Sequence, residues 1–136
     1  MRKLGIDLGD ARIGLALSDP LGIIASGLET YKRKNLEQDL QHIVDIIKSN
    51  NVDTIVMGLP KNMDGTEGER VEKTKEFCAK LKEVTDVKIV FMDERLTTVC
   101  AEKMLIESNV RREDRKKVID KVAACIILQS WLDSAN

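Results

Sequence analysis

The chain of 136 residues has the length of one ordinary domain, and its hydrophobic content of 43% is enough for a single core but leaves no room for a two-domain clamp. Its 22 basic and 23 acidic residues give a net charge of -1, so no global field draws the protein onto nucleic acid or an anionic membrane, and nucleic-acid binding would need a local patch. The sequence shows neither a secretory h-region nor a run approaching the ~18 apolar residues of a membrane span, so we expect a cytoplasmic protein without a membrane partner.

The first predicted element, a strand over Lys3–Gly9, carries an acid where ordinary packing would not place one. Apolar and other residues alternate along it, so that Asp7 shares a face with Gly5 and Gly9. A face of small residues lets another element approach closely. A carboxylate on such a face would be costly unless it met a cation or hydrogen-bond donors. The alternative is a strand-end aspartate that points into water.

Two more strands are expected to complete an antiparallel meander. After a turn at residues 9–11 the alternation resumes, which predicts a hairpin whose second strand places Arg12, Gly14 and Ala16 on the small-residue face. A third strand runs from Gly22 to about Arg33.

A helix follows the meander, with Asn35 as its N-cap and an end that frays at residues 49–51. Its apolar stripe comprises Leu36, Leu40, Ile43, Val44 and Ile47. The single histidine, His42, lies opposite that stripe among polar residues. We therefore expect His42 to be solvated and assign it no role.

Two buried strands are predicted next, over Thr54–Leu59 and Val87–Met92. Between them, the capping-box spacing of Thr66 and Glu69 predicts the start of a helix. A further helix is capped by Thr97 or Thr98 and has Cys100, Ala101, Met104 and Leu105 on its inner face. The three cysteines, Cys78, Cys100 and Cys125, are odd in number and widely spaced among apolar residues, which favours reduced core thiols over disulfides or a zinc site.

The last predicted helix, Arg115–Asp133, carries a second misplaced acid. Asp120 shares a stripe with Ala123, Ala124 and Ile127, its neighbours at i+3, i+4 and i+7. Alanines allow a helix to lie tightly on the small-residue face of the hairpin, which would bring Asp120 near Asp7. Two close carboxylates repel unless a divalent metal keeps both ionised as ligands.

A third carboxylate is available where the strand Val87–Met92 ends in Asp93 and Glu94, at the edge where an open α/β sheet usually offers its site. Adjacent residues of a strand point to opposite faces of the sheet, and the alternation does not show whether Asp93 or Glu94 faces the site. With either, the site would be rich in oxygen ligands and suited to Mg²⁺ or Mn²⁺. The whole order of elements predicts one α/β domain over residues 1–136, with a mixed five-stranded sheet flanked by helices and the Asp7 strand at its centre, between the hairpin strand and Thr54–Leu59.

Four stretches, GIDLGDARIGLALSD, GLPKNMDGTEG, DERLTT and IDKVAACIILQSWL, resemble the bacterial YqgF or RuvX family in the same order and over essentially the whole chain. The resemblance implies an RNase H-like fold related to the RuvC resolvases. It also implies a nuclease that matures the 5′ end of pre-16S ribosomal RNA, with ribosomal subunit precursors as partners. The family's acidic positions fall on Asp7, Glu94 and Asp120, which selects Glu94 by analogy and leaves Asp93 as its substitute.

Carboxylates that hold two divalent ions can support phosphodiester hydrolysis without histidine or serine. The two ions, about 3.5–4 Å apart, activate the water and stabilise the developing charges. The expected phosphate contacts are basic residues near the acids: Arg12, Arg95, Arg111, Arg112, Arg115, Lys116 and Lys117. The alternative for the run from 111 to 117 is a solvated helix entry, since Glu113 and Asp114 interrupt it. The loop Lys61–Glu69, which includes Asn62, would clamp substrate or merely connect.

Three functions remain open at this point. The first is a metal-dependent nuclease acting on structured RNA. The second is a Holliday junction resolvase cutting branched DNA, which requires a homodimer with two active sites rather than a monomer. The third is a nucleic-acid-binding assembly factor without catalysis, in which carboxylate substitutions would leave binding and growth unaffected. A kinase-like interpretation of the glycines in DLGDARIG is weaker, because the chain lacks the length for a second lobe.

Overall fold

A computed structural model of the protein describes residues 1–59, 68–93 and 112–135, with the side chains of residues 93, 112–120 and 135 outside the description. Five strands form one mixed sheet: β1 (Arg2–Leu8), β2 (Arg12–Ser18), β3 (Ala25–Lys32), β4 (Val52–Leu59) and β5 (Lys88–Asp93). Their order is β3-β2-β1-β4-β5, with β1 antiparallel to β2 and parallel to β4. The predicted central position of the Asp7 strand is therefore confirmed.

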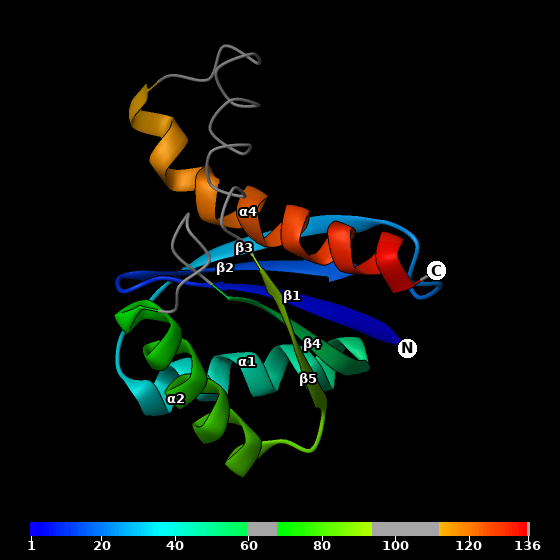
Figure 1. Cartoon of the computed structure of the whole chain (residues 1–136), viewed down its shortest axis with the longest axis horizontal. Coiled ribbons are helices and arrows are strands. Elements are labelled where there is room, and N and C mark those ends of the chain that lie inside the picture. Colours follow the sequence, from blue (N-terminus) through cyan, green and yellow to red (C-terminus); the bar gives the residue numbers. More distant parts are fainter. Residues whose placement is uncertain (60–67, 94–111, 136) are drawn as a thin grey trace.

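Helices cover both faces of this sheet (Figure 1). Helices α1 (Leu36–Asn50) and α2 (Glu69–Val84) lie on one face, and α4 (Arg112–Ala135) lies across the other. The first core joins apolar residues of α1 and α2 to Leu4, Ile6 and Leu8 of β1. The helix residues are Leu40, Ile43, Ile47, Phe77, Cys78 and Leu81. The second joins Ala16, Val56 and other small or branched residues to Ala124, Ile127, Leu128 and Leu132 of α4. The alternation of β1 and β2 thus places larger apolar residues on one face and small residues on the other, as predicted, but each face packs into a core of its own where a single core was expected.

Asn35 caps α1 as expected, because its side-chain oxygen accepts a hydrogen bond of 2.9 Å from the backbone N–H of Gln38. The helix ends at Asn50, and the residue that caps its C-terminus, Asn51, adopts a left-handed conformation with a φ of 53°. The capping box predicted for α2 is wrong. Its N-cap is Gly68, which has no side chain to accept a bond, and acidic residues of the first turn complement the helix dipole instead.

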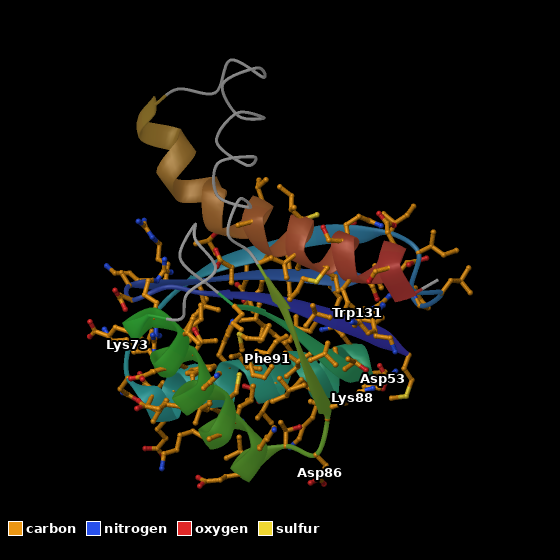
Figure 2. All side chains as sticks on the ribbon, in the orientation of Figure 1. Asp53, Lys73, Asp86, Lys88, Phe91 and Trp131 are labelled. Carbon is orange, nitrogen blue, oxygen red and sulfur yellow. The ribbon has the colours of Figure 1, made fainter. Side chains whose placement is uncertain are left out.

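The prediction that β5 is fully buried is also wrong. It forms the outer strand next to β4 among the described residues, and its Phe91 side chain is 42% exposed. Figure 2 shows Phe91 and Lys88 along this strand. An outer strand has a neighbouring strand on one side only and is less completely covered than a central one. Its apolar composition therefore does not show that its side chains are buried.

His42 is only partly solvated, with 32% of its side chain exposed. Its ring stacks on Tyr31 with centroids 4.2 Å apart, and its Nε2 atom contacts the carboxylate of Glu29. The sequence places His42 opposite the core stripe of α1, but β3 brings Tyr31 and Glu29 against that side of the helix.

Two of the three cysteines lie in the described part, and both are free. Cys78 is buried in the core, and burial raises the pKa of its thiol to about 11. Cys125 is partly buried and its thiol lies 3.4 Å from the carbonyl oxygen of Ala25. Both therefore fit the predicted reduced packing residues, and Cys100 lies outside the described residues.

Candidate active site

Asp7 lies near the carboxyl end of β1, opposite Gly14 of β2 in the strand register. Its neighbours Ile6 and Leu8 belong to the core beneath α1 and α2, so the Asp7 side chain extends toward the α4 face. Only 8% of Asp7 is exposed. An aspartate that simply points into water is thus excluded, and a buried carboxylate occupies the small-residue face.

Helix α4 approaches that face closely at Gly5. A Cβ atom added to Gly5 would lie 2.7 Å from Cβ of Leu128 and 2.8 Å from the carbonyl oxygen of Ala124. Such contacts are closer than packed atoms tolerate, so the helix depends on the absence of a side chain there. The expected packing of the alanine stripe on the glycine face is confirmed.

Polar contacts with β3 set the direction of α4. The Gln129 side-chain oxygen accepts a 2.8 Å hydrogen bond from the backbone N–H of Ala25, and the Lys121 side chain lies against Gly27. Ala25 precedes Gly27 in β3, whereas its partner Gln129 follows Lys121 in α4, so α4 runs antiparallel to β3. Because β3 is parallel to β1, α4 also runs antiparallel to β1. The start of α4 lies toward the end of β1 that carries Asp7, as Figure 1 also shows.

The other predicted acids are described only in part. Asp120 lies in α4, one helical turn before Ala124, and its side chain is outside the description. Asp93 ends β5 with its backbone in register with Leu59 of β4, whereas Glu94 lies outside the described residues.

Most of the predicted phosphate contacts also fall outside the described side chains. Arg12 is the first residue of β2, is partly buried and pairs in register with Lys32. The backbone of α4 includes Arg112, Arg115, Lys116 and Lys117, without their side chains. The remaining predicted residues, Asn62, Arg95 and Arg111, lie outside the described residues.

The donor chemistry at Asp7 fits a hard divalent cation. A carboxylate supplies the oxygen ligands that Mg²⁺ and Mn²⁺ prefer, and the residue opposite Asp7 on β2 is Gly14, which has no side chain. Among residues 1–59, 68–92 and 121–134, no group of three or more histidine, cysteine or acidic side chains lies close enough to hold a metal ion. Two of the three expected ligands, Glu94 and Asp120, lie outside those ranges.

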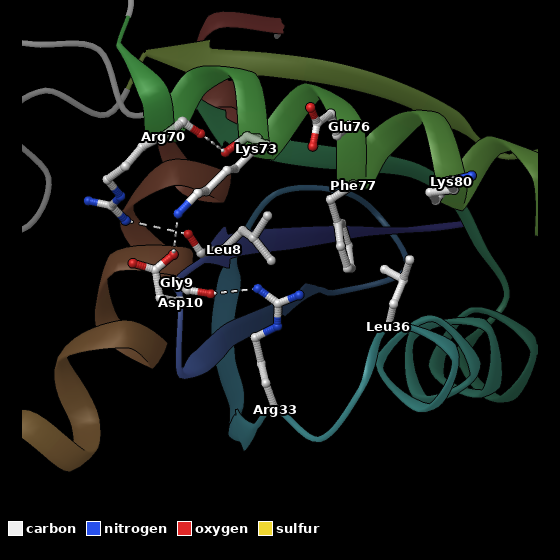
Figure 3. Close-up of a pocket in the computed structure, with 11 residues that line it drawn as sticks. Leu8, Gly9, Asp10, Arg33, Leu36, Arg70, Lys73, Glu76, Phe77 and Lys80 are labelled. Carbon is white, nitrogen blue, oxygen red and sulfur yellow. Dashed lines mark hydrogen bonds and ion pairs between the residues drawn. The ribbon is translucent and has the colours of Figure 1, made fainter.

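The loop after Asp7 is held by two arginines that the sequence pattern does not single out. Arg33 donates a 2.9 Å hydrogen bond to the carbonyl oxygen of Gly9, and Arg70 makes a longer contact of 3.5 Å with that of Leu8 (Figure 3). Arg33 also pairs with the buried carboxylate of Asp39 at 2.9 Å. These contacts join three distant segments, which no local periodicity could indicate.

Burial by itself would raise the pKa of Asp39, but hydrogen bonds outweigh it. The carboxylate accepts bonds from the backbone N–H of Lys34 and from Arg33, with a further one from Tyr31, and together they hold its pKa below the ordinary value of 3.8. Asp39 is therefore ionised at neutral pH and fixes Arg33 beside the loop that follows Asp7.

In the part of the chain that the structure describes, every helix is too short or too polar to cross a membrane.

Comparison with known proteins covers nearly the full chain. A family profile described as "RuvX: Holliday junction resolvase" matches residues 1–134. A protein of Clostridium tetani (strain Massachusetts / E88) named "Putative pre-16S rRNA nuclease" is 54% identical over 98% of this chain and 97% of its own length. A protein of Desulforamulus reducens with the same name is 53% identical over 98% of both chains.

Solved structures with low sequence identity share the fold. The Holliday junction resolvase of fowlpox virus has a TM-score of 0.61 and 15% identity, covering 100% of both chains. RuvC of Thermus thermophilus in complex with a Holliday junction substrate has a TM-score of 0.59 and 12% identity, covering 99% of this chain and 95% of its own. The predicted RNase H-like fold is confirmed.

Proposed function

This chain belongs to the RuvX family, and from that membership we propose that it is a metal-dependent nuclease that processes the 5′ end of pre-16S ribosomal RNA. It is a hydrolase of phosphodiester bonds, as expected from the sequence, because its relatives are named as nucleases and its family is described as a resolvase. In this proposal residues 1–136 form one nuclease domain, and the enzyme works in the cytoplasm on RNA within ribosomal subunit precursors.

The observation that carries the proposal is the buried carboxylate of Asp7 on the face that α4 covers. An ionised acid withdrawn from water is costly unless a cation or hydrogen-bond donors stabilise it. Catalytic acids occupy such positions because the same burial makes their electrostatic effect on a bound substrate stronger.

The packing of α4 supports a place for Asp120 in the same site. From Gly5 to Asp7 the strand advances two residues, about 6.7 Å. From Ala124 back to Asp120 the helix advances four residues, about 6 Å, in the same direction. We therefore propose that the Asp7 and Asp120 carboxylates share one site.

Glu94 is proposed as the third acid of this site. Its predecessor Asp93 ends β5, and β5, β4 and β1 are parallel, so their carboxyl ends meet at one edge of the sheet. Residues just beyond that edge can reach the end of β1. The choice of Glu94 over Asp93 still follows from the family likeness.

In this proposal Asp7, Glu94 and Asp120 would hold Mg²⁺ or Mn²⁺, which supplies Lewis acidity toward a phosphoryl oxygen and lowers the pKa of a bound water. Asp7 contributes a fixed charge on a rigid central strand, so it needs no rearrangement when substrate arrives. Basic residues near the acids, Arg12 among them, would bind the flanking phosphates.

The second candidate is a Holliday junction resolvase, which the family description and the solved resolvase structures favour. It requires a homodimer that presents two active sites to one branched DNA, whereas RNA processing is compatible with a monomer. A non-catalytic assembly factor is the third candidate, in which Asp7 would be dispensable.

One experiment separates the three. Purified protein is given a pre-16S RNA fragment that spans the mature 5′ end, or a four-way DNA junction, with Mg²⁺, Mn²⁺, Ca²⁺ or EDTA, alongside Asp7→Asn protein from the same preparation. We expect cleavage of the RNA with Mg²⁺ or Mn²⁺, little with Ca²⁺ because of its looser coordination, and none by the variant. Cutting of the junction alone would favour the resolvase. Absence of cleavage with RNA binding retained would favour the assembly factor.

A further inference from the structure

A cavity of about 420 Å³ opens beside the loop that follows Asp7 (Figure 3). Three segments line it: residues 8–10 at the end of β1, Arg33 and Leu36 around the start of α1, and one side of α2 from Arg70 to Lys80. The volume lies within the range of ordinary ligand sites, about 300–1,000 Å³. Because Leu8 faces this cavity and Asp7 faces α4, the cavity and the acid lie on opposite faces at the same end of the sheet.

The cavity wall is positively charged although the whole chain has a net charge of -1. Four basic side chains line it, against two acidic ones, Asp10 and Glu76. The basic residues are Arg33, Arg70, Lys73 and Lys80. Outside the lining, Asp39 pairs with Arg33 and Glu69 lies 3.6 Å from Lys73, so the excess of positive charge is confined to the side chains that line the cavity. A local excess of this kind attracts anions where the overall field does not.

The cations differ in how firmly they are held. Arg33 is fixed by short bonds to Asp39 and Gly9. Lys73 is held loosely, since its ammonium lies 3.7 Å from Asp10 and 3.6 Å from Glu69 and its side chain is 53% exposed. Exposed ion pairs of that length contribute little free energy, so Lys73 can turn to a phosphate at small cost. Figure 3 shows its ammonium beside the carboxylate of Asp10.

We infer that this cavity binds a phosphate of the nucleic-acid strand being cut, at a distance from the cleaved bond. A strand that crosses the carboxyl end of β1 would present one phosphate at Asp7 and extend round the sheet end to Lys73 and Lys80. The inference rests on the proposed function, because that function supplies the strand. The phosphate chemistry would equally suit a free nucleotide, and the test distinguishes the two.

The test compares two double variants of α2 with equal loss of charge and equal spacing. Lys73→Gln with Lys80→Gln removes cavity residues, whereas Lys75→Gln with Lys82→Gln removes lysines that do not line it. Affinity for a fluorescent single-stranded RNA is measured in EDTA across a range of salt, with thermal unfolding confirming that each protein is folded. AMP serves as the free-nucleotide probe.

The salt slope of the cavity variant should fall by about 0.7, the change expected for one phosphate that is no longer bound, and the control should keep the parent slope. Equal slopes in all three proteins, or an equal fall in both variants, would overturn the inference. So would AMP binding that requires Lys73 and Lys80 while the RNA slopes stay equal. Because cleavage is not measured, a protein that fails to cut RNA leaves this result interpretable.

Discussion

A Cβ atom on Gly5 would lie 2.8 Å from the backbone carbonyl oxygen of Ala124, so no side chain fits between β1 and α4 at this point. The contact fixes the distance between α4 and β1 at Gly5, two residues before Asp7. It also fixes the part of α4 one turn after Asp120. The separation of the two acids therefore depends on a glycine that takes no part in the chemistry.

Gly5→Ala should destabilise the protein by about 1–3 kcal/mol, because backbone atoms of α4 must move to admit the methyl group. Gly27→Ala is the matched control. Gly27 lies in the same row of the sheet, and its added Cβ would also meet an atom at 2.7 Å, but that atom belongs to the flexible Lys121 side chain. Chemical denaturation should show the smaller loss of stability for Gly27→Ala, and equal losses would contradict the rigid contact.

Asp39→Asn tests the support of the loop after Asp7. The pKa of Asp39 is lowered in the folded protein, so its charge stabilises the fold above the unfolded pKa of about 4, and this contribution disappears as the pH falls through the lower folded value. At pH 7 the variant should be less stable by about 1–3 kcal/mol, since Arg33 loses a charged partner.

The measurement is the free energy of unfolding of parent and Asp39→Asn protein from pH 7 down to pH 3. The difference between them should shrink as the pH falls, because the parent's Asp39 becomes protonated. A constant difference over that range would show that the carboxylate charge is not what supports Arg33.

The basic run at the start of α4 is tested by its effect on salt dependence. Replacing Arg111, Arg112 and Lys116 together with glutamine should reduce the slope of log affinity against log salt for a structured RNA by about 0.7–0.9 for each phosphate that is no longer bound. Binding titrations over a range of salt measure the slope. An unchanged slope would assign the run to a solvated helix entry.

Asp7→Asn should remove the stabilisation that Mg²⁺ gives the folded protein. An ion that binds the native state raises stability by about 1.4 kcal/mol at ten times its dissociation constant. We expect the parent to unfold at a higher temperature with Mg²⁺ than with EDTA, and the variant, still folded, to unfold at the same temperature in both. A variant with the full Mg²⁺ effect would exclude Asp7 as a ligand.

The sequence predicted much of the fold because its main elements have clear periodicity. Alternation in β1 and β2 assigned residues correctly to the two faces of the sheet, and the alanine stripe of α4 correctly indicated the glycine face. Burial of β5 was predicted wrongly because an apolar strand has the same composition at the edge of a sheet as at its centre.

Less of the candidate site than of the fold could be predicted from the sequence. An acid among glycines marked Asp7, whose burial the structure confirms. The support from Arg33 and Arg70 and the cavity beside them arise from segments far apart in the chain, so no local pattern could indicate them. The roles of Glu94 and Asp120 remain predictions.

Asp7, Glu94 and Asp120 are proposed to hold the catalytic ions, and a crystal structure with Mn²⁺ and a bound nucleotide would show whether they do. The anomalous signal should place at least one Mn²⁺ among the three carboxylates, within about 2.0–2.2 Å of an Asp7 oxygen, as expected for a hard cation of this size. Mn²⁺ bound elsewhere, or Asp7 and Asp120 carboxyl groups more than about 8 Å apart, beyond the span of a two-ion site, would show that these residues do not form the metal site.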